Sequence, residues 1–386
     1  MAEMALAVML LAGAGLLLKS FARLTAVDPG FDPEGTLSFE VALPAAGYAE
    51  DARIADFYGR LLERMRALPG VRSAGAVNAL PLSGGDFLIT FDVEGRPAAR
   101  PGEETAMQVR VATPDYFRAM GIPLLRGRGF MAHDRTGAPP VVLLSETAVQ
   151  RWFPGEDPIG KRIKVGWTRY EVSTGGEVIG IVGDVKLMGL DQGSEPEIYL
   201  AHAQAPVGSV AVVVRSARDP LSLAAAVRRE VAALDPSLPV AKVRTIAQLV
   251  SGSVSQPRFT MLLLALFAGA ALVLAAVGIF GVMANGVARR TREIGIRMAL
   301  GADRGAVLRG ILAEALGLSL FGVVLGLTGA LALTRLMAGL LFGVAPADPP
   351  TFAAVAATLV AVALLASWLP ARVATRVDPV VALRTE

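Results

Sequence analysis

The stretch FTMLLLALFAGAALVLAAVGIFGVMANGVA, residues 259–288, contains no charged side chain. A helix needs about 20 apolar residues to cross the hydrocarbon core of a bilayer, and this stretch exceeds that length. Residues 315–334 and 349–371 are uncharged in the same way. Because buried helices of soluble proteins rarely run so far without a charge, we predict three transmembrane helices, at about residues 262–287, 315–334 and 351–370.

A fourth apolar run lies at the start of the chain, where residues 4–18 are uncharged. A signal peptide would carry a basic region before this run and a small-residue cleavage site after it. Here Glu3 comes before the run, and the basic residues Lys19 and Arg23 follow it. This order favours a transmembrane helix over residues 1–21 whose beginning is short or cut off.

The composition of the 386 residues agrees with a membrane protein, since 53% are hydrophobic and 18% are charged. Soluble globular chains carry about 25% charged residues, so the composition argues against a disordered chain and against an ordinary cytosolic enzyme. The chain has no cysteine, which excludes disulfides and zinc–thiolate sites. The net charge of +3 is small and evenly spread, so the sequence does not indicate a basic surface that would bind nucleic acid.

Between the first and second spans, residues 22–258 are numerous enough to form a domain with its own core. Each end of this domain shows a strand-like alternation, then apolar residues at helical spacing, then another strand-like stretch. The predicted strand–helix–strand units are 37–43, 54–68 and 71–77 at one end, and 210–215, 221–234 and 238–243 at the other. Two such units can share one sheet with their helices on one face.

The middle of the domain, about residues 80–207, is predicted to be an inserted subdomain. Its pattern indicates strands and one short helix: strands at 87–93, 107–111, 141–144 and 178–182, and a helix at 116–120. The predicted fold is therefore a membrane protein with four transmembrane α-helices. A large α+β extracytoplasmic domain is inserted between helices 1 and 2.

The orientation in the membrane follows from Lys and Arg, which are in excess on the cytoplasmic side. With four spans, the 289–314 loop and the C-terminal tail share a side. That side carries more basic residues near the membrane than the other: Arg289, Arg290, Arg292, Arg297, Arg304, Arg309, Arg372, Arg376 and Arg384, against Lys19, Arg23, Arg258 and Arg335. Both termini are therefore predicted to be cytoplasmic. The first helix alone argues the other way, which is a second indication that sequence upstream of it is missing.

Motifs for chemistry are weak in this chain. Residues 155–162, GEDPIGKR, differ from a Walker A loop because Arg162 replaces the Ser or Thr that holds magnesium. We interpret this segment as a surface turn. His133 and His202 show no ligand-like spacing, so we predict that both are surface histidines. No paired carboxylates or nucleophile motif is visible, and we predict a protein that is not an enzyme and binds no cofactor of its own.

The loop after the second span is the most distinctive local feature, and we predict a cytoplasmic coupling segment at 289–312. Ile294 and Met298 belong to an apolar face with arginines opposite it. Such a helix lies on lipid headgroups, docks into a groove on a partner, or only anchors the orientation. In the second and third spans, small residues such as Gly278 and Gly326 permit close helix packing.

Residues 289–302, RRTREIGIRMALGA, resemble the signature of FtsX-like ABC transporter permeases. The layout of one helix, a large domain and three helices is similar to the macrolide-exporter (MacB) type. Further segments resemble its periplasmic core domain and its C-terminal end: ALPGV (67–71), YFRAMGIPLLRGRGF (116–130), FPGEDPIGKRI (153–163), VIGIVGDV (178–185), LLFGVAPADPPTF (340–352) and LPARVATRVDPVVALR (369–384). The chain looks most like the C-terminal half of a duplicated permease of the acidobacterial (ADOP) group.

This resemblance implies an MacB-like core domain at 22–258, an FtsX-like permease domain at 259–386, and a location in the bacterial inner membrane. It implies a separate cytoplasmic ABC ATPase that binds the ATP, while this chain transmits the motion to its periplasmic domain. The implied ATPase contacts are Arg289, Arg292, Glu293, Ile294, Gly295, Arg297, Met298 and Gly301. Further implied partners are the lipid membrane, a second permease half or a second copy, and a periplasmic adaptor.

Three functions stay open at this point. The first is a permease subunit for efflux or envelope export. The second is a membrane scaffold that regulates a periplasmic partner such as a cell-wall hydrolase. The third is a ligand sensor that works without ATP.

Overall fold

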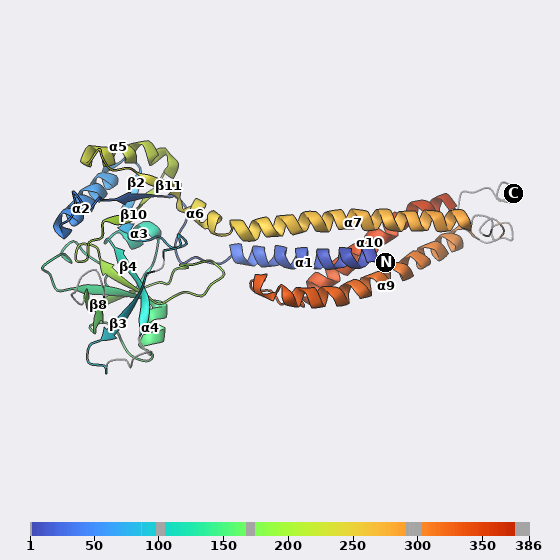
Figure 1. Ribbon diagram of the computed structural model, residues 1–386, viewed down its shortest axis with the longest axis horizontal. Coiled ribbons are helices and arrows are strands. Elements are labelled where there is room, and N and C mark those ends of the chain that lie inside the picture. Colours follow the sequence, from blue (N-terminus) through green and yellow to red (C-terminus); the bar gives the residue numbers. More distant parts are fainter. Residues whose placement is uncertain are drawn as a thin grey trace. The chain divides into compact units, whose positions relative to one another are not determined.

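The computed structural model describes residues 2–85, 87–97, 105–166, 174–290, 293, 296 and 303–374. The chain divides into two compact units. The first combines Met1–Ala26 with Ser255–Glu386, and we refer to it as the helical unit. The second is Val27–Val254, and we refer to it as the sheet unit. Figure 1 shows the elements of both.

Among the described residues, four helices of the helical unit are long and apolar enough to cross a membrane. They are α1 (Ala2–Thr25), α7 (Ser255–Arg289), α9 (Arg304–Leu336) and α10 (Pro349–Ala374). A short 3₁₀ turn, η2 (Ala338–Leu340), follows α9. The predicted spans at 262–287, 315–334 and 351–370 lie inside α7, α9 and α10, and residues 2–21 of the first predicted span lie inside α1.

Helix α1 is the best covered of the four. It packs against both α7 and α9, and α10 packs against the same two helices (Figure 1). The shared core is formed by apolar side chains of all four helices: Met4, Ala7, Val8, Ala275, Val323, Val355, Leu359 and Ala363. Half of the apolar window of α1 is buried, against 11% for α7. Most of the apolar surface of α7 is therefore exposed in this unit, while residues such as Ala275 and Met283 are buried.

Some of the glycines that the sequence suggested for close helix packing do lie where two helices approach most closely. A Cβ atom at Gly326 of α9 would lie 2.4 Å from the Cβ of Val8, and one at Gly329 would overlap Met9. At Gly278 of α7 a Cβ would overlap the Glu3 carboxylate. Gly281, by contrast, has no atom within 4 Å of such a position, so the packing role is confined to particular glycines.

The described strands of the sheet unit form one eleven-stranded sheet in the order β11-β1-β10-β2-β4-β3-β7-β8-β6-β9, with β5 paired to β8. Their bounds are β1 Thr36–Ala42, β2 Val71–Val77, β3 Leu88–Val93, β4 Ala106–Ala112, β5 Leu124–Gly127, β6 Val141–Ser145, β7 Arg162–Val165, β8 Thr174–Val182, β9 Glu197–Ala201, β10 Ser209–Ser216 and β11 Ala241–Thr245. The helices are α2 Asp51–Ala67, α3 Tyr116–Met120, α4 Glu146–Trp152, η1 Pro220–Leu223, α5 Ala224–Leu234 and α6 Ile246–Ser253.

The two predicted strand–helix–strand units come together as expected. Strand β1 lies antiparallel between β10 and β11, and β10 also pairs antiparallel with β2. Helices α2 and α5 pack against each other. The last strand starts later than predicted, at Ala241, because Pro239 has no amide hydrogen for the ladder and Leu238 closes a turn onto Asp235.

The predicted insertion continues the same sheet. Strand β2 meets β4 through the pair Val77 and Ala112, and β4 also runs parallel to β9. The predicted strands at 87–93, 107–111, 141–144 and 178–182 correspond to β3, β4, β6 and β8, and the predicted helix corresponds to α3. Strands β5, β7 and β9 and helix α6 were missed. Whether 80–207 is a separate subdomain stays a prediction.

Candidate coupling site

The predicted coupling segment lies between α7 and α9. Arg289 is the last residue of α7, and Glu293 is helical and exposed. The other predicted ATPase contacts, Arg292, Ile294, Gly295, Arg297, Met298 and Gly301, lie outside the described residues. The same holds for residues 375–386 of the tail. The assignment of this segment to ATPase contact therefore stays a prediction.

An ion pair links the two sides of the coupling segment, one partner directly after α7 and the other in α9. The Arg290 guanidinium lies 2.7 Å from the Glu314 carboxylate, and both side chains are about half exposed. Sequence reasoning did not find this pair. The signal was present, because opposite charges directly follow one apolar run and directly precede the next. The contact links the residue that follows α7 to a residue of α9 that lies beyond the second turn of that helix.

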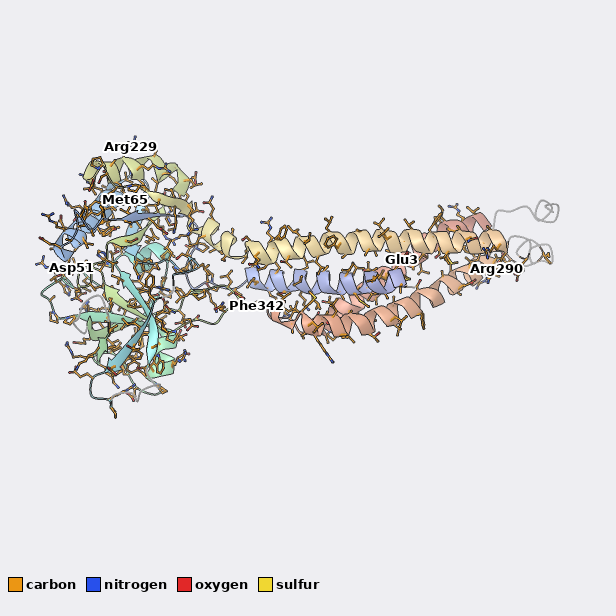
Figure 2. All side chains as sticks on the ribbon, in the orientation of Figure 1. Glu3, Asp51, Met65, Arg229, Arg290 and Phe342 are labelled. Carbon is orange, nitrogen blue, oxygen red and sulfur yellow. The ribbon has the colours of Figure 1, made fainter. Side chains whose placement is uncertain are left out.

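Next to the ion pair lies a small groove of about 110 Å³ between α7 and α9. Its walls are mostly apolar: Val282, Met283, Gly286, Val287, Arg290, Ile311 and Glu314. A second hollow of about 180 Å³ shares Val282 and Met283 and is bordered by Glu3 of α1. Figure 2 shows Glu3 and Arg290 toward the same end of the helical unit. An apolar groove rimmed by charge is a surface that an amphipathic helix can fill.

The sheet unit contains a buried ion pair that the sequence did not reveal. Arg110 of β4 and Glu197 of β9 are both almost fully buried, with Arg110 Nε 3.3 Å from Glu197 Oε1. Tyr199 donates a hydrogen bond to Glu197 at 2.9 Å, and Arg110 Nη2 donates to the Gly85 carbonyl at 3.0 Å. Burial raises the pKa of Glu197 to about 7, although Arg110 acts in the opposite direction.

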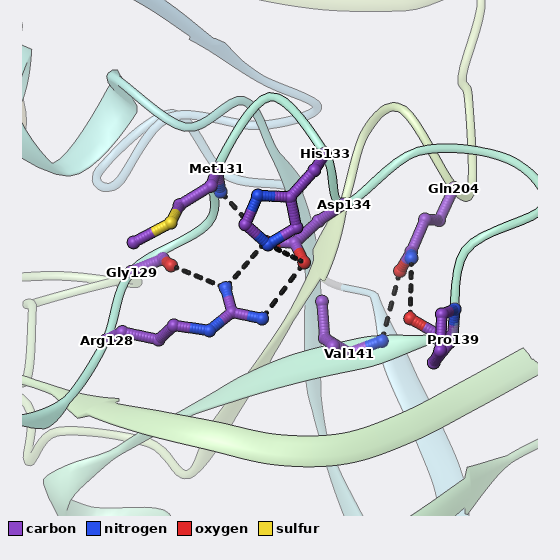
Figure 3. Close-up of polar contacts among 8 residues, drawn as sticks. All are labelled: Arg128, Gly129, Met131, His133, Asp134, Pro139, Val141 and Gln204. Carbon is purple, nitrogen blue, oxygen red and sulfur yellow. Dashed lines mark hydrogen bonds and ion pairs between the residues drawn. The ribbon is translucent and has the colours of Figure 1, made fainter.

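The two histidines differ from each other. His133 is 67% exposed, as predicted, and lies beside Asp134 (Figure 3). Asp134 is buried and accepts both forks of the Arg128 guanidinium, at 2.7 and 3.0 Å. Burial alone would raise the pKa of Asp134, but hydrogen bonds from Arg128 and the Met131 amide lower it below 3.8. The acid is thus an ionised structural brace of the loop and not a proton donor.

The prediction that His202 lies on the surface is wrong. His202 is 3% exposed, and its ring meets Tyr58 edge to face at 5.2 Å. Its Nε2 lies 3.3 Å from the Val207 carbonyl. Burial lowers the pKa of His202 to about 4, so the imidazole is neutral near pH 7. The prediction failed because the sequence around His202 gives no sign that Tyr58 of α2 packs against it.

The Walker-like loop is a surface turn, as predicted. Gly155 and Gly160 have positive φ angles, which fits turn positions. The Glu156 carboxylate pairs with both Lys161 and Arg96, so the lysine of the loop already has an acidic partner. A phosphate would have to displace that carboxylate.

The sequence matches two family models. Residues 4–230 match the model of the MacB-like periplasmic core domain, and residues 265–379 match that of the FtsX-like permease C-terminal domain. The chain is 28% identical over 323 residues to the macrolide export ATP-binding/permease protein MacB of Marinobacter nauticus, covering 78% of this chain and 48% of that protein. It is 27% identical to the pyoverdine export ATP-binding/permease protein PvdT of Pseudomonas putida, covering 68% of this chain and 41% of that protein.

Among solved structures, the periplasmic region of MacB from Actinobacillus actinomycetemcomitans covers 60% of this chain and 97% of its own. It has a TM-score of 0.38 and 14% identity. The chain spans about half the length of the curated relatives it matches. The two family models together cover most of the sequence. The model of the MacB-like periplasmic core domain matches before α7, and that of the FtsX-like permease domain matches from within α7 onward. The chain belongs to the ABC transporter permeases that join a MacB-like periplasmic core domain to an FtsX-like permease domain.

Proposed function

We propose that this chain is the permease subunit of an ABC-type complex in the bacterial inner membrane. A separate cytoplasmic ATPase supplies ATP hydrolysis, and this chain converts it into movement of the sheet unit. The relatives named for macrolide and pyoverdine export favour efflux or envelope export as the task. In this proposal both termini are cytoplasmic, and the sheet unit is periplasmic between the first and second spans.

The observation that carries the proposal is the construction of the helical unit. Residues 4–18, 259–288, 315–334 and 349–371 contain no charged side chain, so the charges of the four helices lie outside these stretches. An ion or proton path would place ionisable groups in the middle of the helices. A bundle of this kind is suited to moving as packed rods, with the coupling segment at one end.

The family implies partners on both sides of the membrane. We infer that the ATPase contacts the segment around Glu293 and Arg297, and that a second copy or another permease half completes the complex. A periplasmic adaptor would extend the sheet unit. ATP binds to the partner ATPase and not to this chain, which agrees with the acidic partner that Lys161 already has in the Walker-like loop.

The test is co-purification of the tagged full chain from membranes, followed by identification of bound proteins and measurement of ATP hydrolysis. Glu293→Lys and Arg297→Glu are expected to lose the ATPase. Arg229→Glu, a charge reversal on the exposed face of α5 (Figure 2), is the matched control and should retain it. No ATPase with the wild-type chain refutes the coupling role.

The alternative is a membrane scaffold that regulates a periplasmic partner such as a cell-wall hydrolase. The same experiment separates the two functions, because a scaffold of this kind would carry a hydrolase. An exporter would carry an adaptor or an outer-membrane component.

A further inference from the structure

The end of α1 that leads into the sheet unit is tied to the beginning of α10 by polar contacts. Lys19 Nζ donates to both carboxylate oxygens of Asp348, each at 2.7 Å. The Ser20 hydroxyl accepts a hydrogen bond from the Phe342 amide at 2.8 Å. We refer to these four residues as the α1–α10 joint. Figure 2 shows Phe342 toward the end of the helical unit opposite Glu3 and Arg290.

The acidic half of the joint is held by α10 itself. Asp348 Oδ2 accepts from the Thr351 amide at 3.2 Å and from its hydroxyl at 2.6 Å, which makes Asp348 the N-cap of α10. Pro349 follows as the first helical residue, the position that proline favours. The carboxylate therefore has a fixed direction before Lys19 reaches it. Hydrogen bonding from Lys19 lowers the pKa of Asp348 below 3.8, so this partner is ionised.

The helices also approach each other closely here. A Cβ at Gly15 would lie 2.9 Å from the Thr351 methyl carbon, so the Thr351 side chain packs directly against the backbone of α1 at Gly15. The Asp348 side chain is 13% exposed and that of Lys19 is 33% exposed. A partly buried pair with two equal hydrogen bonds holds its geometry better than an exposed surface pair does.

The joint differs in kind from the contacts along the middle of the bundle. There α1 meets its neighbours through Ala7, Val8 and similar apolar side chains. These apolar contacts set how closely the helices pack, but they include no directional polar contact. A bidentate ion pair fixes one helix end relative to another. The Arg290–Glu314 pair links the end of α7 to α9 at the other end, but it is about half exposed and holds its geometry less firmly.

Chain connectivity gives the joint a mechanical role. The coupling segment precedes α9, residues 337–348 connect α9 to α10, and the joint connects α10 to α1. Beyond α1, strand β1 of the sheet unit begins at Thr36. A displacement that enters at α9 can thus reach the sheet unit through α10 and α1.

We propose that the α1–α10 joint is the positioning element through which the α9–α10 hairpin carries α1, and with it the entry strand of the sheet unit. This inference rests on the proposed coupling function. Lys19 and Asp348 act as a pair, so loss of either is expected to weaken transmission to the entry strand through α1, while α7 still links the coupling segment to the other end of the sheet unit and ATPase binding is unaffected.

The experiment measures the two halves of the function separately in the complex with the co-purifying ATPase. Because this chain has no cysteine, it is spin-labelled only at the introduced pair Arg229→Cys and Leu336→Cys before the ATPase is added, and the pair reports the distance between α5 and the end of α9. The variants are Lys19→Met and Asp348→Asn. Asparagine keeps the N-cap of α10 while removing the charge.

The expected result is that both variants bind the ATPase and hydrolyse ATP at the wild-type rate, whereas the ATP-dependent change in distance is smaller than in wild type. The double variant should be no worse than either single one, because both remove the same interaction. Arg335→Met, which removes an exposed cation in the last turn of α9, is the control and should keep the full response.

A wild-type response that persists in Lys19→Met and Asp348→Asn overturns the joint as a transmitting element. The same holds if these variants only lower the melting temperature. If the wild-type complex shows no ATP-dependent change in distance, the proposed coupling function fails, and the role of the joint in it fails too. The two failures are therefore distinguishable.

Discussion

Replacing the buried histidine of the sheet unit should change how its stability depends on pH. His202 is neutral in the folded chain because burial lowers its pKa from 6.5 to about 4. In the unfolded chain the imidazole binds a proton at its ordinary pKa. The stability that the neutral ring contributes is therefore fully present above pH 6.5 and is lost as the pH falls from 6.5 toward 4.

The size of the effect follows from the two pKa values. Between about pH 7.5 and about pH 5, linkage predicts a loss of roughly 2 kcal/mol in unfolding free energy from this group alone. His202→Phe removes the titration and can keep the edge-to-face contact with Tyr58, although it loses the hydrogen bond to Val207, worth about 1 kcal/mol. The variant should thus be less stable than wild type near neutral pH and lose less stability on acidification.

The assay is urea unfolding of the full chain in detergent at the two pH values, followed by tryptophan fluorescence. The quantity compared is the difference between wild type and His202→Phe, because other groups cancel in it. This matters for Glu197, whose raised pKa gives the opposite trend: the folded chain takes up its proton first, so stability rises as the pH falls from about 7 toward 4.5. A difference between wild type and variant that stays constant across the two pH values would refute the burial argument.

Two further predictions concern packing and charge. Gly326→Val should separate α1 from α9 and cost about 1–3 kcal/mol, since its Cβ would lie 2.4 Å from Val8. Gly281→Val, in open space, is the control in the same thermal-retention assay, and equal losses in both would contradict the packing argument. Arg110→Met should cost about 3–5 kcal/mol in the unfolding of the sheet unit because Glu197 stays buried without its cation. Adding Glu197→Leu should restore most of that loss, and a double variant as unstable as the single one would argue against the ion pair as the cause.

The sequence located the spans and most regular elements because their signals are local. A bilayer demands a run of apolar residues, and a half-buried strand or helix demands its own period. Residues 315–334 lie inside α9, and the alternation in residues 37–43 corresponds to β1. Strand β5 was missed for the matching reason: all its residues are exposed, so it has no alternation to detect.

The features that were missed depend on residues far apart in the chain. Glu197 follows a proline in an otherwise ordinary loop, and its burial makes sense only beside Arg110 from β4. His202 is covered by Tyr58 of α2. Lys19 and Asp348 are separated by most of the sequence, and each one alone indicates only a charge near a membrane surface. Pairing of this kind is set by topology, which a single sequence does not state.

In the helical unit, the contacts that stabilise the bundle and the contacts that would transmit motion lie in different places. The middle is held by close apolar packing at positions such as Gly326 and Val8, which contributes to stability without directional polar contacts. The ends carry ion pairs: the partly buried Lys19–Asp348 pair, which makes two directed hydrogen bonds, and the half-exposed Arg290–Glu314 pair, which contributes little to stability. Damage to the middle should therefore lower the melting temperature of the complex and leave its residual motion coupled. Damage at the ends should leave the melting temperature almost unchanged and weaken the transmission of motion.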